Sequence, residues 1–392
     1  MQELKQACLV CQEQRLVDVL DLGMHPCADT FVSRGQYAGC DKVWPLIVCM
    51  CENCGHVQTR YRVSQDTRYK ETEYSFVSSH SESYRKYWNE FALKHTNPGQ
   101  TIVELGCNDG YLLKKCEDNG CHAFGIDPSE AMVTIALARG LDVFCGYFED
   151  GIISRDNCVD LLIACNVLNH VDNIQRCMET AFNVLKDDGR FVIQVPSWSW
   201  MVENGGFDQV YHEHVHYFSV ASMASMAKRF GFTMTDVELV NFHGVSMVVT
   251  LRKGDVASSC DVGTHPDVAT ITIASKKFDT HVERLQSELF ALRAVGRTVF
   301  TLGASAKGNT LLTCAHATHR EVKAVLEVSD RKIDKFTPLS RIPIVDEGTL
   351  AMHNDPVVVL TTRNLPTSVV NNLKRINPTT EVLAPFSDEV ST

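Results

Sequence analysis

Three features are scarce or missing in this sequence: an excess of basic residues, long apolar runs and an apolar leader. Lys and Arg number 37 against 48 Asp and Glu, which gives a formal net charge of −11. Nucleic acids and anionic membranes are bound by basic surfaces, so we expect no nucleic-acid partner and no membrane partner. No apolar run reaches the length of a membrane span, and the N-terminal residues lack a signal-peptide core. We therefore expect a cytoplasmic protein.

Cysteine, by contrast, is plentiful, and two pairs stand apart from the rest. Most of the 16 cysteines are scattered through strand and helix patterns, where a reduced thiol is a small buried apolar group. Two C-x-x-C pairs, Cys8/Cys11 and Cys51/Cys54, supply four thiolates, which suit a structural tetrahedral Zn²⁺ with no open position. Two unrelated pairs are the simpler alternative. Rival ligands for the metal are Cys27, Cys40 and Cys49.

The stretch from Thr101 to Leu113 has the pattern of a strand, a tight turn and a helix. Its apolar run ends in Gly106-x-x-x-Gly110, after which apolar residues recur at helical spacing. Glycine at both positions lets the backbone approach a ligand closely. A second strand, 122–126, ends in Asp127-Pro128, where an acid of a βαβ unit binds ribose hydroxyls. The pattern predicts a nucleoside-binding crevice at the carboxyl edge of a parallel sheet.

The residues of this turn distinguish between nucleosides. A dinucleotide site needs Gly-x-Gly-x-x-Gly, but here Asn108 replaces the middle glycine and Asp109 places an acid where a pyrophosphate would lie. Glu104 adds negative charge near the strand end. S-adenosylmethionine lacks phosphate and carries sulfonium and ammonium groups, so we predict it as the methyl donor. A nicotinamide oxidoreductase is disfavoured, and an α/β domain without a ligand is the simpler alternative.

The rest of the central region continues a doubly wound α/β pattern. Its expected elements are strand 159–164, helix 174–185, strand 190–195, helix 221–230 and a hairpin of 232–240 with 245–251. Phe148, Glu149 and Asn166 follow the third and fourth strands and should face the crevice. Ahead of the first strand, the segment 74–79 either covers the nucleoside, touches the substrate or serves packing; a helix is expected at 82–95.

The segment 207–218 concentrates histidines, acids and tyrosines, which are costly to bury for structure alone. Extended backbone would place His212, His214 and His216 on one side, which permits a metal site. The alternative is acid–base chemistry by a histidine that a neighbouring carboxylate orients. A histidine-rich surface loop is the simplest explanation.

A polar break at 254–268 precedes a second α/β unit. Helix 271–295 leads to strand 298–302 and to a turn that contains Lys307, Gly308 and Asn309. The turn is not a P-loop, because lysine would have to follow Gly308. It still suits the phosphates of a sugar nucleotide, since it lies at a helix N-terminus. The next strand, 322–328, is followed by Ser329-Asp330 and repeats the layout of the first unit.

These pieces in this order resemble the zinc-containing three-domain sugar C-methyltransferases. The resemblance covers nearly the whole chain and rests on the four cysteines, ELGCNDG (104–110), NVLNH (166–170), YHEH (211–214) followed by YF, and GASAKGNTLL (303–312). We expect an α/β protein with a zinc-binding module (1–70), a Rossmann-like class I methyltransferase domain (71–255) and a Rossmann-like sugar-nucleotide domain (256–392). His216, and Pro-Leu-Ser-Arg at 338–341, depart from the family pattern.

The resemblance implies S-adenosylmethionine-dependent methylation of a carbon beside the keto group of a nucleotide-linked 4-keto-deoxysugar. By match, His214 is the base that forms an enolate, Tyr211 and Glu213 place the base or the substrate, and His170 hydrogen-bonds the enolate oxygen. Donor contacts are expected from Glu104, Gly106, Asn108, Asp109, Gly110, Asp127, Pro128, Phe148, Glu149 and Asn166. Substrate contacts are expected from Tyr74, Ser79, Lys307, Asn309 and Asp330. We expect structural zinc and a monomer; the alternatives are an O- or N-methyltransferase and a zinc-bearing interaction protein with an inactive core.

Overall fold

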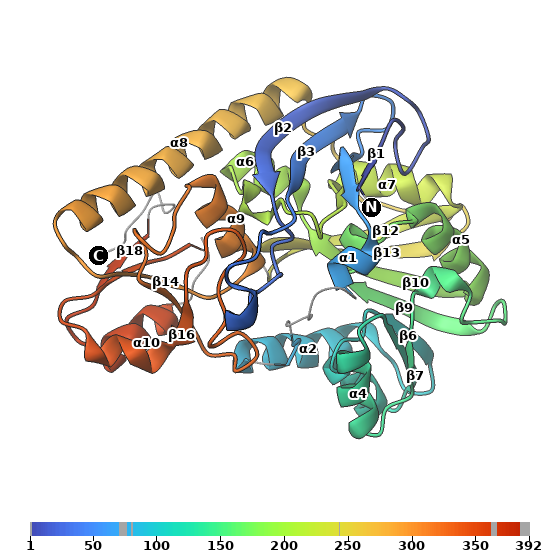
Figure 1. Ribbon diagram of the computed structural model, residues 1–392. Coiled ribbons are helices and arrows are strands. Elements are labelled where there is room, and N and C mark those ends of the chain that lie inside the picture. Colours follow the sequence, from blue (N-terminus) through green and yellow to red (C-terminus); the bar gives the residue numbers. More distant parts are fainter. Residues whose placement is uncertain (1, 70–76, 80, 243, 362–366, 385–392) are drawn as a thin grey trace.

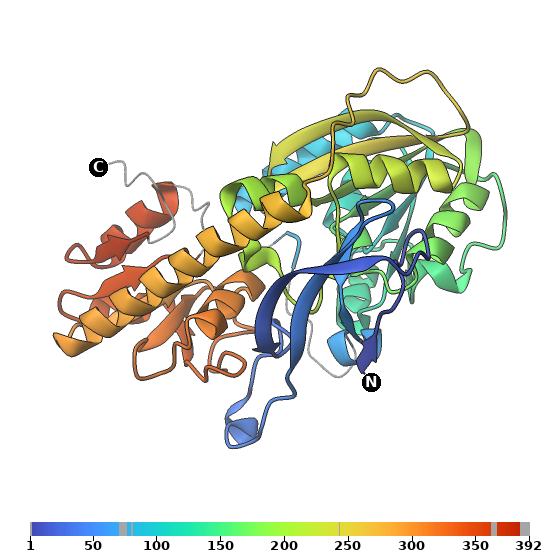
Figure 2. The same ribbon diagram turned by 90° about the horizontal axis from the view of Figure 1, so that it is seen from above.

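The computed structural model describes residues 2–69, 77–79, 81–242, 244–361 and 367–384 (Figure 1). A central α/β part and a C-terminal α/β part lie side by side, and the N-terminal strands lie against both. The helix α8 (Val268–Ala294) runs from the central part along the C-terminal part (Figure 2). The two α/β parts therefore face each other with the N-terminal strands at their junction.

The central part is built on a seven-stranded sheet with helices on both faces. Its elements are α2 (Glu82–His95), β6 (Thr101–Leu105), α3 (Tyr111–Asp118), β7 (His122–Asp127), α4 (Glu130–Ala138), β8 (Val143–Cys145), η2 (Phe148–Asp150), β9 (Val159–Cys165), η3 (Leu168–His170), α5 (Ile174–Val184), β10 (Leu185–Pro196), α6 (Trp198–Asn204), η4 (Phe207–Gln209), α7 (Val220–Arg229), β12 (Phe232–Asn241) and β13 (Val245–Lys253). Alternate residues of β6 point to opposite faces. Ile102 packs with residues of α2 and α3, whereas Val103 and Leu105 pack with residues of α5 and α7.

The order of the strands in this sheet is β12-β13-β10-β9-β6-β7-β8. The strands from β10 to β8 are parallel, and β13 is antiparallel to both of its neighbours. The strand order changes direction between β6 and β9, which is where open α/β sheets bind ligands, beyond the carboxyl ends of the strands. The hairpin predicted from the sequence is β12–β13, and it completes the sheet.

The N-terminal strands form a sheet that takes one strand from the central part. The elements are β1 (Gln2–Leu4), β2 (Leu16–His25), η1 (Arg34–Gln36), β3 (Trp44–Cys51), β4 (Val57–Thr59), β5 (Tyr61–Val63), α1 (Gln65–Tyr69) and β11 (His216–Tyr217). The four-stranded sheet has the order β11-β4-β3-β2, with β11 antiparallel to β4. Because β11 closely follows the YHEH sequence, this pairing anchors the histidine-rich segment on the N-terminal sheet.

The C-terminal part is a five-stranded parallel sheet. Beyond α8, its elements are β14 (Val299–Leu302), α9 (Ala306–Cys314), β15 (Ala324–Glu327), β16 (Ile344–Asp346), η5 (Glu347–Met352), β17 (Val357–Val359), α10 (Thr367–Ile376) and β18 (Glu381–Leu383). The order β16-β15-β14-β17-β18 again changes direction beside the first strand. The two α/β parts thus repeat the same layout.

Two apolar cores join the N-terminal part to its neighbours. Cys8, Val10 and Cys51 belong to the core formed by the central sheet with α5 and α7. Leu46 and Val48 of β3 belong to a second core, which includes Trp198 of α6, Phe278 of α8 and residues of the C-terminal sheet. Burial of apolar area is the main force holding such parts together, so the N-terminal sheet is an integral part of the assembly.

The predicted α/β fold class, with its cysteine-rich N-terminal module and two Rossmann-like sheets, is confirmed. The helix expected at 82–95 is α2, and the one expected at 271–295 is α8, which begins three residues earlier because Asp267 caps it through the amide of Thr270. In the described part of the chain, no helix combines the length and the apolar content that crossing a bilayer requires.

Candidate active site

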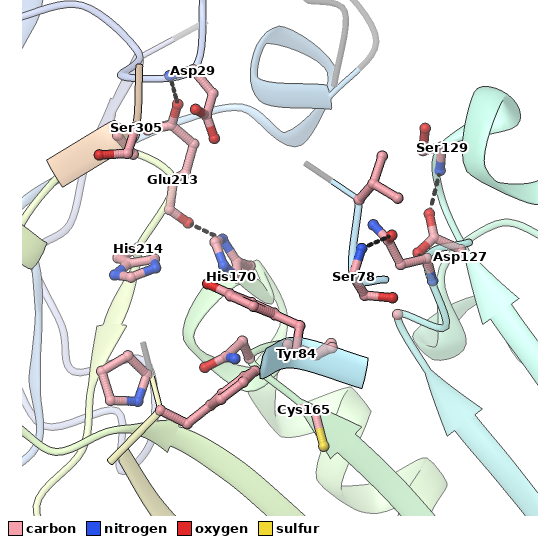
Figure 3. Close-up of a pocket in the computed structure, with 18 of the residues that line it drawn as sticks. Asp29, Ser78, Tyr84, Asp127, Ser129, Cys165, His170, Glu213, His214 and Ser305 are labelled. Carbon is pink, nitrogen blue, oxygen red and sulfur yellow. Dashed lines mark hydrogen bonds between the residues drawn. The ribbon is translucent and has the colours of Figure 1, made fainter. Parts of the chain in front are cut away.

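A cavity of about 1020 Å³ lies where the three parts of the chain meet. Ligand sites in proteins usually have volumes of about 300–1,000 Å³, so this cavity is at the upper end of that range. Asp127 and Ser78 lie on one side of it, and His170, Glu213 and His214 lie on the other (Figure 3). The predicted site residues on its wall are Glu104, Gly106, Asn108, Asp127, Pro128, Phe148, Glu149, Asn166, His170, Tyr211, Glu213, His214 and Lys307. The structure therefore brings together most of the residues that were predicted from separate motifs.

The turn after β6 requires glycine at two positions. At Gly106, φ is +65°, and a Cβ atom would lie 2.4 Å from Cγ2 of Val167. At Gly110, φ is +76°, and a Cβ atom would lie 2.3 Å from Cδ1 of Leu141. A side chain at either position would be strained and would clash. Gly106 lines the cavity and leaves room there because it has no side chain. Gly110 is needed for the turn and does not line the cavity.

Two buried carboxyl groups face the cavity beside this turn. Oδ2 of Asp127 accepts a hydrogen bond from the amide of Asn108 at 2.9 Å, and Oδ1 accepts one from the amide of Ser129 at 2.8 Å. Burial nevertheless raises the pKa of Asp127 to about 6. Glu104 is also buried, its Oε2 has no hydrogen-bond partner, and burial followed by the nearby Asp109 and Asp127 raises its pKa. An unpaired buried carboxylate calls for a cation or a hydroxyl donor, so this wall fits a ligand with ammonium and ribose groups.

Asp109 has a different position from the one expected. Its side chain has no exposed surface, and it accepts hydrogen bonds from the hydroxyls of Ser78 and Ser79 and pairs with Arg139 at 2.9 Å. The amide of Ser78 also donates to Oδ1 of Asn108 at 2.9 Å. Asp109 therefore fastens the segment 77–79 over the turn. Ser79 itself points to Asp109 rather than into the cavity, and Tyr74 lies outside the described residues.

The residues at the ends of β8 and β9 complete the donor side of the cavity. Phe148 and Glu149 of η2 are both buried. Oε1 of Glu149 lies 3.5 Å from Nε2 of Gln65 in α1. Asn166 adopts a left-handed φ of +56°, and its buried Oδ1 has no hydrogen-bond partner. Both segments line the cavity, so the third and fourth strand ends face it as predicted.

The three histidines of the histidine-rich segment point to three different places. Nδ1 of His214 lies 3.0 Å from the carbonyl oxygen of Gln209, and Nε2 lies 2.7 Å from the hydroxyl of Tyr211. His212 reaches the carbonyl of His25, and His216 pairs with His56 at 2.9 Å. Among the described residues, the group that could bind a metal consists of the four N-terminal cysteines. A shared metal site on this segment is therefore not supported.

His170 and Glu213 lie next to His214 on the cavity wall. Nδ1 of His170 lies 2.7 Å from the carbonyl oxygen of Glu213, and the rings of His170 and His214 are 4.7 Å apart. Burial, followed by the charge of Arg68, lowers the pKa of His170 to about 3, so its imidazole is neutral. Oε1 of Glu213 accepts from the amide of Asp29 at 3.0 Å, while Oε2 has no partner. Burial first and then Asp29 raise the pKa of Glu213 to about 7.

The C-terminal part contributes a second rim to the cavity. Ser305, Lys307, Glu327 and Lys332 line it. Oε2 of Glu327 accepts from the amide of Ala304 at 2.9 Å, which is the same arrangement as Asp127 with Asn108. Glu327 was missed in the sequence, although its place as the last residue of the second strand was a usable signal. Of the residues expected to bind substrate, Asp330 is exposed and off the wall, and Asn309 donates to the carbonyl of Ala28 at 2.7 Å.

The four N-terminal cysteines form a metal site. Their Sγ atoms all lie within 4.8 Å of one another, with Cys8 and Cys54 at 3.7 Å and Cys11 and Cys51 at 3.5 Å. Zn–S bonds of about 2.3 Å in a tetrahedron place sulfurs about 3.8 Å apart, so the set fits zinc. The rival Cys49 instead donates to the carbonyl of Gln58. Four sulfur ligands leave no open position, which makes the site structural.

Comparisons with known proteins match each part of the chain. Residues 8–69 match a zinc binding domain family, residues 76–237 a methyltransferase domain family, and residues 266–383 the C-methyltransferase C-terminal domain family. The C-methyltransferase NovU of Streptomyces niveus is 26% identical over 94% of this chain and 92% of its own length. Phosphoethanolamine N-methyltransferase 1 of Arabidopsis thaliana is 27% identical over 44% of this chain and 37% of its own length. Magnesium protoporphyrin IX methyltransferase of Synechocystis PCC 6803 aligns with 44% of this chain and 84% of its own, at 14% identity and a TM-score of 0.36.

The sheet, the glycine turn and the acid at the end of β7 define a Rossmann-like, S-adenosylmethionine-dependent methyltransferase. Within that class, the cysteine cluster before the methyltransferase sheet and the second parallel sheet after it indicate a C-methyltransferase. The chain belongs to the zinc-containing, three-domain C-methyltransferase family, as predicted from its motifs.

We expect Asp127→Ala to weaken the binding of S-adenosylmethionine by about 1.5–3 kcal/mol, because hydroxyl hydrogen bonds to a charged acceptor are lost. Isothermal titration calorimetry measures this change. Glu130→Ala, which removes an exposed acid three residues away, should leave the affinity unchanged. In the wild type, the affinity should also fall as the pH drops through about 6, because the carboxyl of Asp127 becomes protonated there. An unaltered donor affinity in Asp127→Ala, or preferential binding of a nicotinamide dinucleotide, would contradict the assignment.

Proposed function

We propose that this enzyme methylates a carbon beside the keto group of a nucleotide-linked 4-keto-deoxysugar, through an enolate that a histidine base forms. A proton on a carbon next to a carbonyl is weakly acidic, so its removal needs a positioned base. The observation that carries the proposal is the pair of Tyr211 and His214 on the wall of the methyl-donor cavity. Bound S-adenosylmethionine supplies an electrophilic methyl group.

The surroundings of His214 define which of its nitrogens is basic. Nδ1 faces a carbonyl oxygen at 3.0 Å, and a carbonyl oxygen can only accept a hydrogen bond, so the proton of the neutral ring lies on Nδ1. Nε2 therefore carries the lone pair and accepts from the hydroxyl of Tyr211. Nε2 is the atom that takes the proton from the substrate carbon once the substrate has displaced this hydroxyl.

Tyr211 has a second role in this scheme. Once the substrate has displaced it, the hydroxyl of Tyr211 no longer donates to Nε2 of His214, and a protonated Nε2 cannot accept from it again. The hydroxyl hydrogen of Tyr211 can then turn to the enolate oxygen as negative charge develops on it. A donor in that place stabilises the charge more strongly in a buried site than it would in water.

His170 does not offer the donor that was expected of it for the enolate oxygen. Its Nδ1 faces the carbonyl of Glu213 at 2.7 Å and therefore carries the proton, which leaves Nε2 as an acceptor. The low pKa of about 3 keeps the ring in this neutral form. We therefore assign His170 to accept a hydrogen bond from a substrate hydroxyl, and we assign the enolate oxygen to Tyr211.

Glu213 and Asp29 support the binding of a polar substrate at the same place. Glu213 is buried and Asp29 is half-buried. Burial raises the pKa of each carboxyl group, and the nearby Asp29 raises the pKa of Glu213 further. Oε2 of Glu213 has no partner, so a sugar hydroxyl that donates to it would satisfy a buried acceptor. The wall opposite the donor side is thus lined for a hydroxylated ring.

The C-terminal rim supports the nucleotide part of the substrate. Lys307 and Lys332 both line the cavity, and the ammonium group of Lys332 donates to the carbonyl of Ala304 at 2.7 Å. Burial lowers the pKa of Lys307 and the nearby Asp208 opposes this shift, so a further anion beside the lysine would favour its charged form more strongly. A diphosphate between these lysines and the start of α9 would be such an anion.

Product analysis tests the proposal. The enzyme is incubated with methyl-labelled S-adenosylmethionine and a panel of nucleotide-linked 4-keto-deoxysugars, and the products are characterised by mass spectrometry and NMR. We expect a new methyl group on a carbon next to the carbonyl. A methyl group on oxygen or nitrogen would overturn the enolate mechanism, and turnover of free sugars in preference to their nucleotide-linked forms would overturn the substrate class.

A further inference from the structure

Arg68 of α1 is a buried cation whose hydrogen bonds converge on the two catalytic segments. Its side chain has no exposed surface, although it forms part of the cavity wall. Nη1 donates to the carbonyl of His170 at 3.0 Å and to the carbonyl of Glu213 at 3.2 Å. Nε donates to the carbonyl of Val63 at 3.0 Å, and Nη2 pairs with the carboxylate of Asp172. One guanidinium thus connects the end of the N-terminal strands with both sides of the catalytic histidine pair.

This arrangement is too costly to arise from charge pairing alone. The attraction within a buried ion pair often does no more than offset the desolvation of its two charges. Pairing with Asp172 therefore explains why the charge of Arg68 can be buried, but it does not explain why Arg68 lies between His170 and Glu213. The planar fork of arginine can hold several acceptors in fixed directions, whereas the ammonium group of lysine is a point donor on a flexible stem. Both carbonyls that Nη1 holds belong to residues assigned to the reaction.

We propose that Arg68 is a positioning residue, which sets the distance between His170 and the YHEH segment. The proposal rests on the function proposed above. The hydrogen bond from Nδ1 of His170 to the carbonyl of Glu213 is 2.7 Å long, and Arg68 holds the backbone at both of its ends. The hydroxyl of the neighbouring Tyr69 also lies 2.8 Å from Nδ1 of His170. The last residues of the N-terminal part therefore orient an imidazole of the central part.

Arg62 provides a matched control for the experiment. It pairs with the same Asp172 at 3.6 Å and donates to its carbonyl at 3.3 Å, but its described contacts do not include His170 or Glu213. The steady-state kinetics of Arg68→Lys, Arg68→Ala and Arg62→Ala are compared on one substrate, together with donor affinity by calorimetry. We expect kcat to fall about 10²-fold in Arg68→Ala, as for other small misplacements of catalytic groups. In Arg68→Lys, kcat should fall about tenfold, because lysine keeps the positive charge but lacks the planar guanidinium group that holds several acceptors.

Three further readouts separate positioning from a general loss of stability. Donor affinity should change less than about twofold in Arg68→Lys, and kcat of Arg62→Ala should stay within about twofold of the wild type. Added guanidinium ion should restore part of kcat in Arg68→Ala but should not affect Arg62→Ala. In ¹⁵N-histidine NMR, which needs no substrate, the Nδ1–H of His170 should lose its protection from solvent exchange in both Arg68 variants.

The outcomes divide clearly. Near-native kcat in Arg68→Lys and Arg68→Ala, or an unchanged His170 Nδ1–H signal, would overturn the proposal. A drop in kcat that follows melting temperature equally in Arg62→Ala and Arg68→Ala, without guanidinium rescue, would also overturn it in favour of a purely structural role. A methyl group found on oxygen or nitrogen in the wild-type product would refute the enolate function, yet it would leave the NMR comparison intact as a test of Arg68.

Discussion

Replacing His214 by glutamine is expected to lower kcat by a factor of about 10²–10⁴, which is the usual contribution of a positioned general base. Glutamine has a similar length and retains a polar group next to Tyr211, but it cannot take a proton. The affinity for the substrate should stay within a few-fold, because the lost interaction acts mainly in the transition state. Steady-state kinetics and calorimetry measure the two quantities separately.

Hydrogen exchange tests the same step without methyl transfer. A bound 4-keto sugar in D₂O should exchange the proton on the carbon next to its carbonyl in the wild type, and His214→Gln should abolish this exchange. His319→Gln, which removes an exposed histidine of the C-terminal part, serves as the control and should behave as the wild type. If His214→Gln kept near-native methylation, the base would have to be Tyr211 or His170, whose Nε2 is also an acceptor in this structure.

Loss of one zinc ligand is expected to have the largest effect on stability. Cys51 has no exposed surface and belongs to the same apolar core as the central sheet, so Cys51→Ser disturbs both the metal and the packing around it. We expect the free energy of unfolding to fall by more than about 4 kcal/mol, the range that accompanies loss of a metal. Thermal or denaturant unfolding measures the fall, and metal analysis of the wild type should return about one zinc per chain.

Cys40→Ser is the matched control for this substitution. Cys40 is exposed and lies outside the four-sulfur group, so its replacement should change stability by less than about 0.5 kcal/mol. A wild-type protein that contained no metal, and that kept its melting temperature after treatment with a strong chelator, would refute the structural zinc site. Donor affinity in the folded fraction of Cys51→Ser should change less than stability does, because none of the four metal-binding cysteines lines the cavity.

The zinc-bearing part is nevertheless closer to the reaction than the sequence suggested. Gln65, Arg68 and Tyr69 of α1 all line the cavity, and two of them contact His170. The sequence placed these residues in the N-terminal module, remote from the histidine motifs. Zinc stabilises the fold of this module. The module contributes side chains to the active-site cavity, whereas the metal itself lies outside it.

Local patterns in the sequence determined several features of this protein without any structure. A four-cysteine metal site requires only that the two turns that carry the C-x-x-C pairs come together. Gly106 and Gly110 supply the positive φ that a single turn needs. The acid at the end of β7 was also predictable, because side chains at the carboxyl ends of parallel strands gather at one edge of the sheet. Such features depend on spacing along the chain, which the sequence displays directly.

The tertiary structure alone decided the features that depend on side-chain direction and on contacts between distant segments. Asp109 is one residue from Asn108, yet it turns away from the cavity to bind Ser78 and Ser79. His212, His214 and His216 diverge because the chain turns within the motif and then pairs with β4. Arg68 meets His170 and Glu213 across more than a hundred residues of sequence. A hydrogen bond requires an atom within about 3 Å in a defined direction, and spacing along the chain does not encode that direction until the three parts have packed together.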